Sequence, residues 1–186
     1  MNIIVSDVMF ALWFFLPAGI ANASPVIAKK IPLLNKWTTP IDFGKSYRDR
    51  RILGDNKTWR GVIFGAFSGG VTGSITYLVY PQSIHYVSIS ILSPIVAMFV
   101  VGASLGTGAL VGDAVESFFK RQLGIKPGHS WFPFDQIDYI IGGLVFATPF
   151  VILSFKANLL ILVTWFCAHL FWSYIAYLLK LKDKPI

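Results

Sequence analysis

Five long apolar segments dominate this chain and limit what it can fold into. They cover residues 3–28, 61–80, 86–115, 137–155 and 158–179. About 20 consecutive apolar residues are enough for a helix to cross the hydrocarbon core of a bilayer. Only 13% of the 186 residues are charged, whereas a soluble domain carries about 25%. The sequence therefore predicts an all-α integral membrane protein with five transmembrane helices, forming one polytopic domain over residues 1–186.

The basic residues predict how these helices are oriented. With five spans, all but one of the 16 Lys and Arg residues fall in three places: the connection 29–60, the connection 116–136 and the C-terminal tail. Only Lys156 falls on the other side. Cytoplasmic connections carry the excess of Lys and Arg, so we expect the N-terminus outside and the C-terminus in the cytoplasm. The net charge of +7 then marks the inner membrane face rather than a nucleic-acid-binding surface.

The first apolar segment has features of both a membrane helix and a leader. Pro17 and Pro25 predict a kinked or broken helix. A signal peptide would begin with a basic region, but this segment begins with Asp7 and without Lys or Arg. We therefore expect a retained helix. The single cysteine, Cys167, excludes a disulfide within the chain and a cysteine metal site.

Acidic and basic side chains gather just beyond the third apolar segment. Asp113, Glu116, Ser117, Lys120 and Arg121 are spaced i, i+3, i+4, i+7 and i+8, which places them on one face of a helix. A pair between Glu116 and Lys120 would be an ordinary helix-surface contact, but it leaves Asp113 unexplained. A carboxylate at membrane depth is costly, so we expect Asp113 near the inner interface or facing the protein interior.

Two further acids follow at the start of the fourth segment. Asp135 and Asp138 are three residues apart and would share a helical face. One of them could serve as a helix N-cap, but two acids together with Asp113 and Glu116 exceed what capping needs. Hard oxygen ligands of this kind suit Mg²⁺, which binds one or two carboxylates together with substrate phosphates.

The second apolar segment is preceded by bases and rich in small residues. Lys57, Thr58 and Arg60 stand at its start, where a helix N-terminus would attract phosphate. The alternative is a positively charged membrane flank with Trp59 as an interface anchor. Glycines at 61, 65, 69, 70 and 73 favour close helix packing. A backbone-lined nucleotide pocket is the alternative for these glycines.

Together these motifs resemble a known family. The pattern Asp113-x-x-Glu116-Ser117-x-x-Lys120-Arg121, then Gly124-x-Lys126, then Pro133-x-Asp135-Gln136-x-Asp138 is similar to the signature of the CTP:phosphatidate cytidylyltransferases. The segment Gly54-Asp55-x-Lys57-Thr58-x-Arg60-Gly61 resembles the archaeal branch, the CDP-archaeol synthases. Gln136 stands where the broader family has arginine, which also favours that branch.

The resemblance implies an enzyme of phospholipid biosynthesis in the cell membrane, with its active site facing the cytoplasm. It implies Mg²⁺-dependent transfer of a cytidylyl group from CTP to unsaturated archaeol phosphate, with release of pyrophosphate. Asp113, Asp135 and Asp138 are then the expected metal ligands, and Glu116 would position a metal-bound water or Lys120. The expected nucleotide-binding residues are Lys57, Thr58, Arg60, Ser117, Lys120 and Arg121, and the expected catalytic residues are Asp113, Glu116, Lys120 and Asp135.

Two other functions stay open at this point. A CTP-dependent polyprenol or phytol kinase would have a related layout but would release CDP. An ion-coupled transporter usually carries internal repeats and polar sites at the membrane midplane. This chain has no evident repeat, and its polar groups lie at one membrane face. Nothing in the sequence indicates a protein partner.

Overall fold

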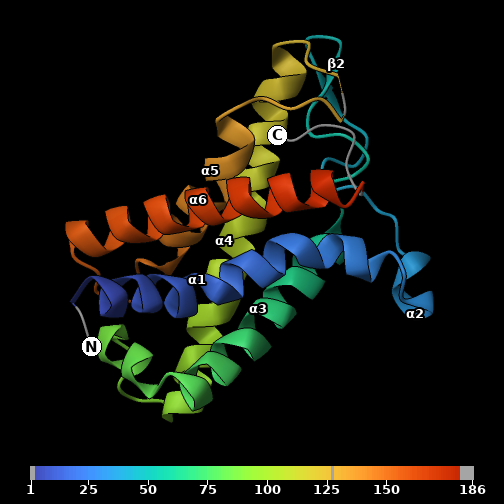
Figure 1. Cartoon of the computed structure of the whole chain (residues 1–186). Coiled ribbons are helices and arrows are strands. Elements are labelled where there is room, and N and C mark those ends of the chain that lie inside the picture. Colours follow the sequence, from blue (N-terminus) through green and yellow to red (C-terminus); the bar gives the residue numbers. More distant parts are fainter. Residues whose placement is uncertain (1–2, 127, 181–186) are drawn as a thin grey trace.

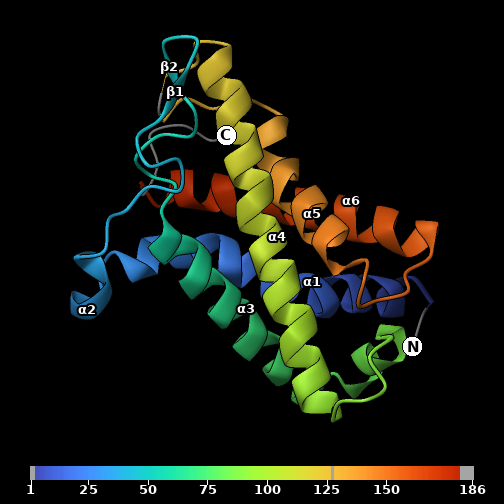
Figure 2. The ribbon, with the colours of Figure 1, turned by 180° about the vertical axis from the view of Figure 1, so that it is seen from behind.

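The computed structural model describes residues 3–126 and 128–180, which form a bundle of tilted helices (Figure 1). Its elements are α1 (Ile3–Ala28), α2 (Pro32–Asn35), β1 (Ser46–Tyr47), β2 (Arg50–Arg51), α3 (Trp59–Val79), the 3₁₀ helix η1 (Pro81–Tyr86), α4 (Pro94–Gln122), α5 (Phe134–Ala147) and α6 (Phe155–Leu178). Helix α4 packs against α1, α3 and α5. The connection between α1 and α3 gathers beside the end of α4 and the start of α5 (Figure 2).

Four of the predicted spans are confirmed as helices that are long and apolar enough to cross a membrane. They are Val5–Ala28, Trp59–Val79, Pro94–Gln122 and Phe155–Leu178. The fourth predicted segment differs, because α5 has only 14 residues, or about 21 Å at 1.5 Å per residue. The hydrocarbon core is about 30 Å thick. Among the described residues, four helices rather than five therefore have full spanning length.

The third predicted segment is shifted along the chain. Residues 87–93 are not helical, and α4 begins only at Pro94, because proline fits the first turn of a helix, where its missing N–H is not needed. The predicted continuation of this helix beyond Asp113 is confirmed, since α4 ends at Gln122 and Gly124 adopts a φ of +78°. The prediction that the connection begins at residue 116 is therefore wrong: residues 116–122 belong to α4, and the connection covers 123–133.

We expected a kinked or broken helix at Pro17 and Pro25; helix α1 is continuous through both, so it is not broken there. Pro25 has no N–H to donate to the carbonyl of Ala21, four residues earlier. The hydroxyl of Ser24 donates to that carbonyl instead, at 2.7 Å. A neighbouring hydroxyl of this kind satisfies the freed backbone group inside a membrane.

Glycines bring α4 into backbone contact with its two neighbours. A Cβ atom added at Gly69 or Gly102 would come within 3.0 Å of the facing helix backbone, where α3 crosses α4. The same is true at Gly108, Gly112 and Gly142, where α4 crosses α5. Small residues let membrane helices approach this closely. The packing interpretation of the glycines in the second apolar segment is therefore confirmed for the α3–α4 contact.

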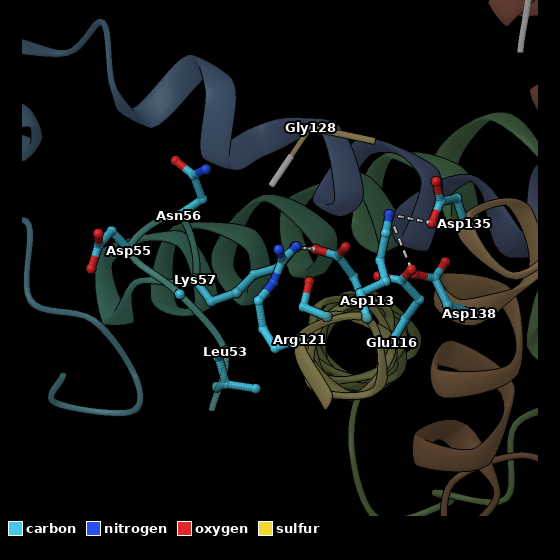
Figure 3. A pocket seen from close by; sticks show the side chains of 13 residues that line it. Leu53, Asp55, Asn56, Lys57, Asp113, Glu116, Arg121, Gly128, Asp135 and Asp138 are labelled. Carbon is cyan, nitrogen blue, oxygen red and sulfur yellow. Dashed lines mark hydrogen bonds and ion pairs between the residues drawn. The ribbon is translucent and has the colours of Figure 1, made fainter. Parts of the chain in front are cut away.

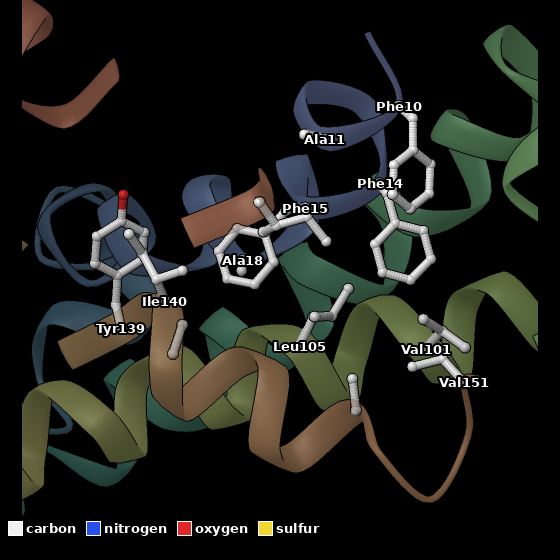
Figure 4. Packing of buried hydrophobic residues seen from close by; sticks show 13 residues of the cluster. Phe10, Ala11, Phe14, Phe15, Ala18, Val101, Leu105, Tyr139, Ile140 and Val151 are labelled. Atoms are coloured by element: carbon white, nitrogen blue, oxygen red, sulfur yellow. The ribbon is translucent and has the colours of Figure 1, made fainter. Parts of the chain in front are cut away.

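The apolar core lies between α1, α4 and α5 (Figure 4). Phe14 and Phe15 of α1 are fully buried and face Leu105 of α4 and Ile140 of α5. At the end of the bundle away from the α1–α3 connection, Val87 pairs with Val151 through a β-bridge. The core thus fixes the start of α5, and the acids it carries, relative to the C-terminal half of α4.

Candidate active site

The polar face of α4 forms one wall of a cavity of about 370 Å³. The five side chains predicted to share a helical face all line it: Asp113, Glu116, Ser117, Lys120 and Arg121. The opposite walls come from the α1–α3 connection, through Leu53, Gly54, Asp55, Asn56 and Lys57, and from Gly128, Asp135 and Asp138 (Figure 3). Residues far apart in the sequence thus meet in one polar cavity at one end of the bundle.

Three carboxylates converge at the floor of this cavity. Asp113, Glu116 and Asp138 each place one oxygen within 4.8 Å of the others. Figure 3 shows Asp138 of α5 facing Glu116 of α4. Like charges this close repel strongly, so such a group requires cations nearby. One cation is Lys57, whose Nζ lies 2.5 Å from Asp113 Oδ2.

Asp135 lies outside this group of three. Its Oδ1 is 2.7 Å from Lys120 Nζ, and its Oδ2 accepts a hydrogen bond of 2.9 Å from the backbone N–H of Trp131. Lys120 also lies 3.2 Å from Glu116 Oε1. Lys120 therefore bridges Asp135 and Glu116, whose carboxyl groups also interact directly with each other. The structure places Glu116, rather than the predicted Asp135, with Asp113 and Asp138.

The donor set fits a hard divalent cation. All three groups are carboxylates, which Mg²⁺ prefers over nitrogen or sulfur ligands. Glu116 is buried, and its Oε1 accepts no hydrogen bond of good geometry, although the Lys120 ammonium is near. A buried oxygen without such a donor is expensive, and a metal ion would satisfy it. Asp113, Glu116 and Asp138 are thus the described residues best placed to hold a metal.

The cavity wall made by the α1–α3 connection is organised by one buried acid, Asp42. Its carboxylate accepts hydrogen bonds from the backbone N–H groups of Gly44 (3.0 Å), Leu53 (2.9 Å) and Gly54 (3.1 Å). It also pairs with Arg51 at 3.0 Å. Burial alone would raise the pKa of Asp42, but these donors outweigh it and lower the pKa to about 2. Leu53 and Gly54, which begin the cavity wall, are therefore held by a charged side chain eleven and twelve residues earlier.

Two predicted nucleotide-binding residues are placed elsewhere. Arg60 is buried and donates to the carbonyls of Leu34 and Asn35 at 3.1 and 3.2 Å. Its guanidinium therefore ties α2 to α3 and does not line the cavity. Thr58 is the N-cap of α3, where its hydroxyl accepts a hydrogen bond from the N–H of Gly61.

Arg121 lines the cavity but is partly engaged. Its guanidinium donates to the carbonyl of Ile125 at 2.6 Å, just past the end of α4. A planar guanidinium has five N–H donors, so this contact leaves others for a phosphate. Asp55 and Asn56 also line the cavity, although neither has a role predicted from the sequence and only Asp55 is named in the motif before the second apolar segment. Asp42 carried no sequence signal, because an isolated acid in a loop does not reveal that it will be buried.

The comparisons with known proteins decide the family. A family model described as CarS-like, CDP-archaeol synthase, matches residues 2–186. The chain belongs to the CDP-archaeol synthase family. The resemblance first noted in the motifs around Asp113 and Asp135 therefore extends over almost the whole chain.

Relatives in this family match at nearly full length. The CDP-archaeol synthase of Pyrococcus furiosus is 40% identical over 179 residues, covering 96% of this chain and 98% of that protein. The CDP-archaeol synthase of Methanocaldococcus jannaschii is 36% identical over 174 residues, covering 93% and 94%. The lipid kinase and transporter alternatives receive no support from these matches.

A solved structure also resembles this one. It is described as an intramembrane enzyme for archaeal membrane lipids biosynthesis, and it aligns with a TM-score of 0.69 at 29% identity. The alignment covers 88% of this chain and 92% of that one. This chain therefore shares its helical bundle with that intramembrane enzyme.

Proposed function

We propose that this chain transfers a cytidylyl group from CTP to unsaturated archaeol phosphate, giving a CDP-archaeol-type lipid and pyrophosphate. Membership of the CDP-archaeol synthase family is the observation that carries this proposal. The cavity supports it, because carboxylates and ammonium groups meet there at one end of a membrane bundle. The enzyme would act in phospholipid biosynthesis in the cell membrane.

The chemistry needs little from side chains beyond positioning and charge. A phosphate oxygen of the lipid attacks the α-phosphorus of CTP. The bond from that phosphorus to the α–β bridging oxygen of CTP breaks, and this oxygen leaves as part of pyrophosphate. The lipid phosphate is already ionised, so no side-chain nucleophile or strong base is required. Holding two anions in line and stabilising the charge on the leaving pyrophosphate are the main tasks.

The described residues can divide these tasks. Asp113, Glu116 and Asp138 would hold a divalent metal, for which we propose Mg²⁺, with Asp135 acting through Lys120. When bound, such an ion would neutralise phosphate charge and stabilise the leaving oxygen. Lys57 and Lys120 each place an ammonium at the cavity while pairing with a carboxylate. They would bind phosphate oxygens, and Arg121 and Ser117 line the same cavity.

We further propose that α5 completes a fifth crossing of the membrane, with the N-terminus outside and the active site facing the cytoplasm. Helix α5 starts beside the cavity, and the chain that follows it reaches the opposite end of the bundle, where Val151 pairs with Val87. The basic residues of the α1–α3 connection then lie on the cytoplasmic side, as the positive-inside rule expects.

A turnover assay on purified protein in detergent tests the proposed function. It would contain unsaturated archaeol phosphate and labelled CTP, with Mg²⁺ or with EDTA. We expect a CDP-lipid and an equal amount of pyrophosphate, both only when metal is present. Asp113→Asn and Asp135→Asn should abolish turnover while leaving the protein folded. CDP in place of pyrophosphate, formed with a lipid alcohol as acceptor, would instead identify a kinase.

A further inference from the structure

Three cavities follow one another along the α3–α4 side of the bundle. The carboxylate cavity shares Asn56, Lys57 and Asp113 with a second cavity of about 190 Å³. This second cavity shares Ile41, Val62 and Leu110 with a third, of about 460 Å³. The series therefore leads from the carboxylates proposed to hold the metal to a third cavity that contains none of the polar side chains of α4. We call the third cavity the apolar groove.

The character of the walls changes along this series. The carboxylate cavity is lined mainly by charged and polar groups, and the middle cavity mixes Lys29, Asn56 and Asp113 with aliphatic side chains. The apolar groove is lined only by aliphatic and aromatic residues, among them Ala114 and Phe118 of α4. An amphiphile with a charged head and a hydrocarbon chain matches this order of surfaces.

The apolar groove differs from an ordinary lipid-facing surface because a loop covers it. Ile41, Ile52 and Leu53 of the α1–α3 connection line it together with α3 and α4. Leu53 also lines the carboxylate cavity, and its N–H is held by Asp42. A connection at the membrane surface normally presents polar side chains to water. Here it places three apolar side chains over a gap between two helices.

We propose that the apolar groove binds one isoprenoid chain of the lipid acceptor, whose phosphate reaches the carboxylate cavity past Lys57. This inference rests on the proposed function and adds the path of the lipid to it. A chain seated beneath Ile52 and Leu53 would hold the phosphate near Asp113. Binding energy from the unreactive chain would thus serve to position the reacting oxygen.

A fourth cavity, outside this series, provides the competing path for the lipid chain. It has about 380 Å³, lies between α1, α5 and α6, and is lined by Gly19, Tyr139, Trp165 and Ala176, among others. None of its described lining residues also lines the carboxylate cavity, but Asn22 lines both it and the middle cavity, so it too could lead toward Asp113. A lipid chain in that cavity would contact α1, α5 and α6, whereas one in the apolar groove would contact α3, α4 and the α1–α3 connection.

Filling each cavity in turn tests the inference. Ala114→Phe fills the apolar groove, and Ala176→Phe is the matched control, with the same substitution in the competing cavity. Each variant is assayed with unsaturated archaeol phosphate and with a dihexyl ether phosphate, whose chains are too short to extend far into a groove. We expect Ala114→Phe to lower kcat/KM for the long-chain acceptor about tenfold or more. Its kcat/KM for the dihexyl acceptor and its KM for CTP should stay unchanged, and Ala176→Phe should behave like the wild type.

The outcomes separate the two proposals. A wild-type enzyme that makes no CDP-lipid from either acceptor would refute the proposed function, and the groove with it. An active wild type with equal losses for both acceptors in Ala114→Phe would refute the groove alone. Selective loss in Ala176→Phe would place the chain in the competing cavity. If Ala114→Phe does not fold, Val115→Trp, at a half-exposed position of the same groove, replaces it with the same expected selectivity.

Discussion

Replacing Asp42 by asparagine should loosen the wall of the active site without touching the reacting groups. The side chain of Asp42 is 1% exposed and accepts three backbone hydrogen bonds in addition to its pair with Arg51. Asparagine keeps the shape but loses the charge. Its NH₂ group would also meet N–H donors that need an acceptor, and unsatisfied buried groups are costly.

The size of the effect follows from the pKa of Asp42. The carboxyl is lowered from its ordinary value of 3.8 to about 2, and a tenfold change in an acid equilibrium equals about 1.4 kcal/mol. The charged form therefore stabilises the ordered loop by about 2.5 kcal/mol at neutral pH. Losing that contribution should make local opening of the loop about 60-fold more frequent.

Limited trypsin digestion in detergent measures this opening, because Lys45, Arg48 and Arg50 are exposed cleavage sites in the same loop. When opening and closing are fast, the cleavage rate follows the open population. We expect Asp42→Asn to be cut about 60-fold faster and to show a higher KM for CTP. Asp49→Asn is the matched control, since it removes the same charge from an exposed position in the hairpin. Equal cleavage rates in the two variants would refute the role given to Asp42.

Three further outcomes are expected. Hydrogen-exchange protection of the Leu53 amide, corrected for the intrinsic rate, should be full above about pH 4 and fall as the pH drops toward 2, because protonation of Asp42 removes the acceptor charge; constant protection over this range would contradict the pKa. Asp138→Asn should remove the rise in melting temperature that Mg²⁺ gives the wild type, and should lower kcat at least about 100-fold; a retained metal-induced shift would exclude Asp138 as a ligand. Gly142→Ala should destabilise the protein by about 1–3 kcal/mol, because its Cβ would overlap the carbonyl of Gly108; a melting temperature equal to that of the wild type would show that the two helices can separate.

The sequence predicted those parts of the site that depend on local periodicity. Asp113, Glu116 and Lys120 line one cavity because α4 is a regular helix through all three positions, and helical spacing alone places them on one face. The short length of α5 was missed, since the hydropathy of residues 148–154 resembles that of the helix before them. A hydropathy profile shows which residues are apolar, but it does not show where a turn ends a helix.

The parts of the site that were missed depend on tertiary contacts. Arg60 follows Lys57 by three residues, yet it points to the carbonyls of α2. Spacing cannot reveal this, because it depends on where α2 packs. Likewise, Asp135 and Asp138 are equivalent by sequence, and only the crossing of α4 and α5 places Asp138 with the carboxylates and Asp135 with Lys120.

The contact at Gly108, Gly112 and Gly142 has a consequence for motion during turnover. Asp113 follows Gly112 directly, and a Cβ at Gly112 would overlap the carbonyl of Asp138 itself. Since backbone touches backbone there, no side chain can change its rotamer to let the two acids move apart or together. The backbone positions of Asp113 and Asp138 are therefore fixed relative to each other by main-chain contact. We therefore expect the opening that admits CTP or releases pyrophosphate to come from the opposite wall of the cavity, the α1–α3 connection that carries Lys57.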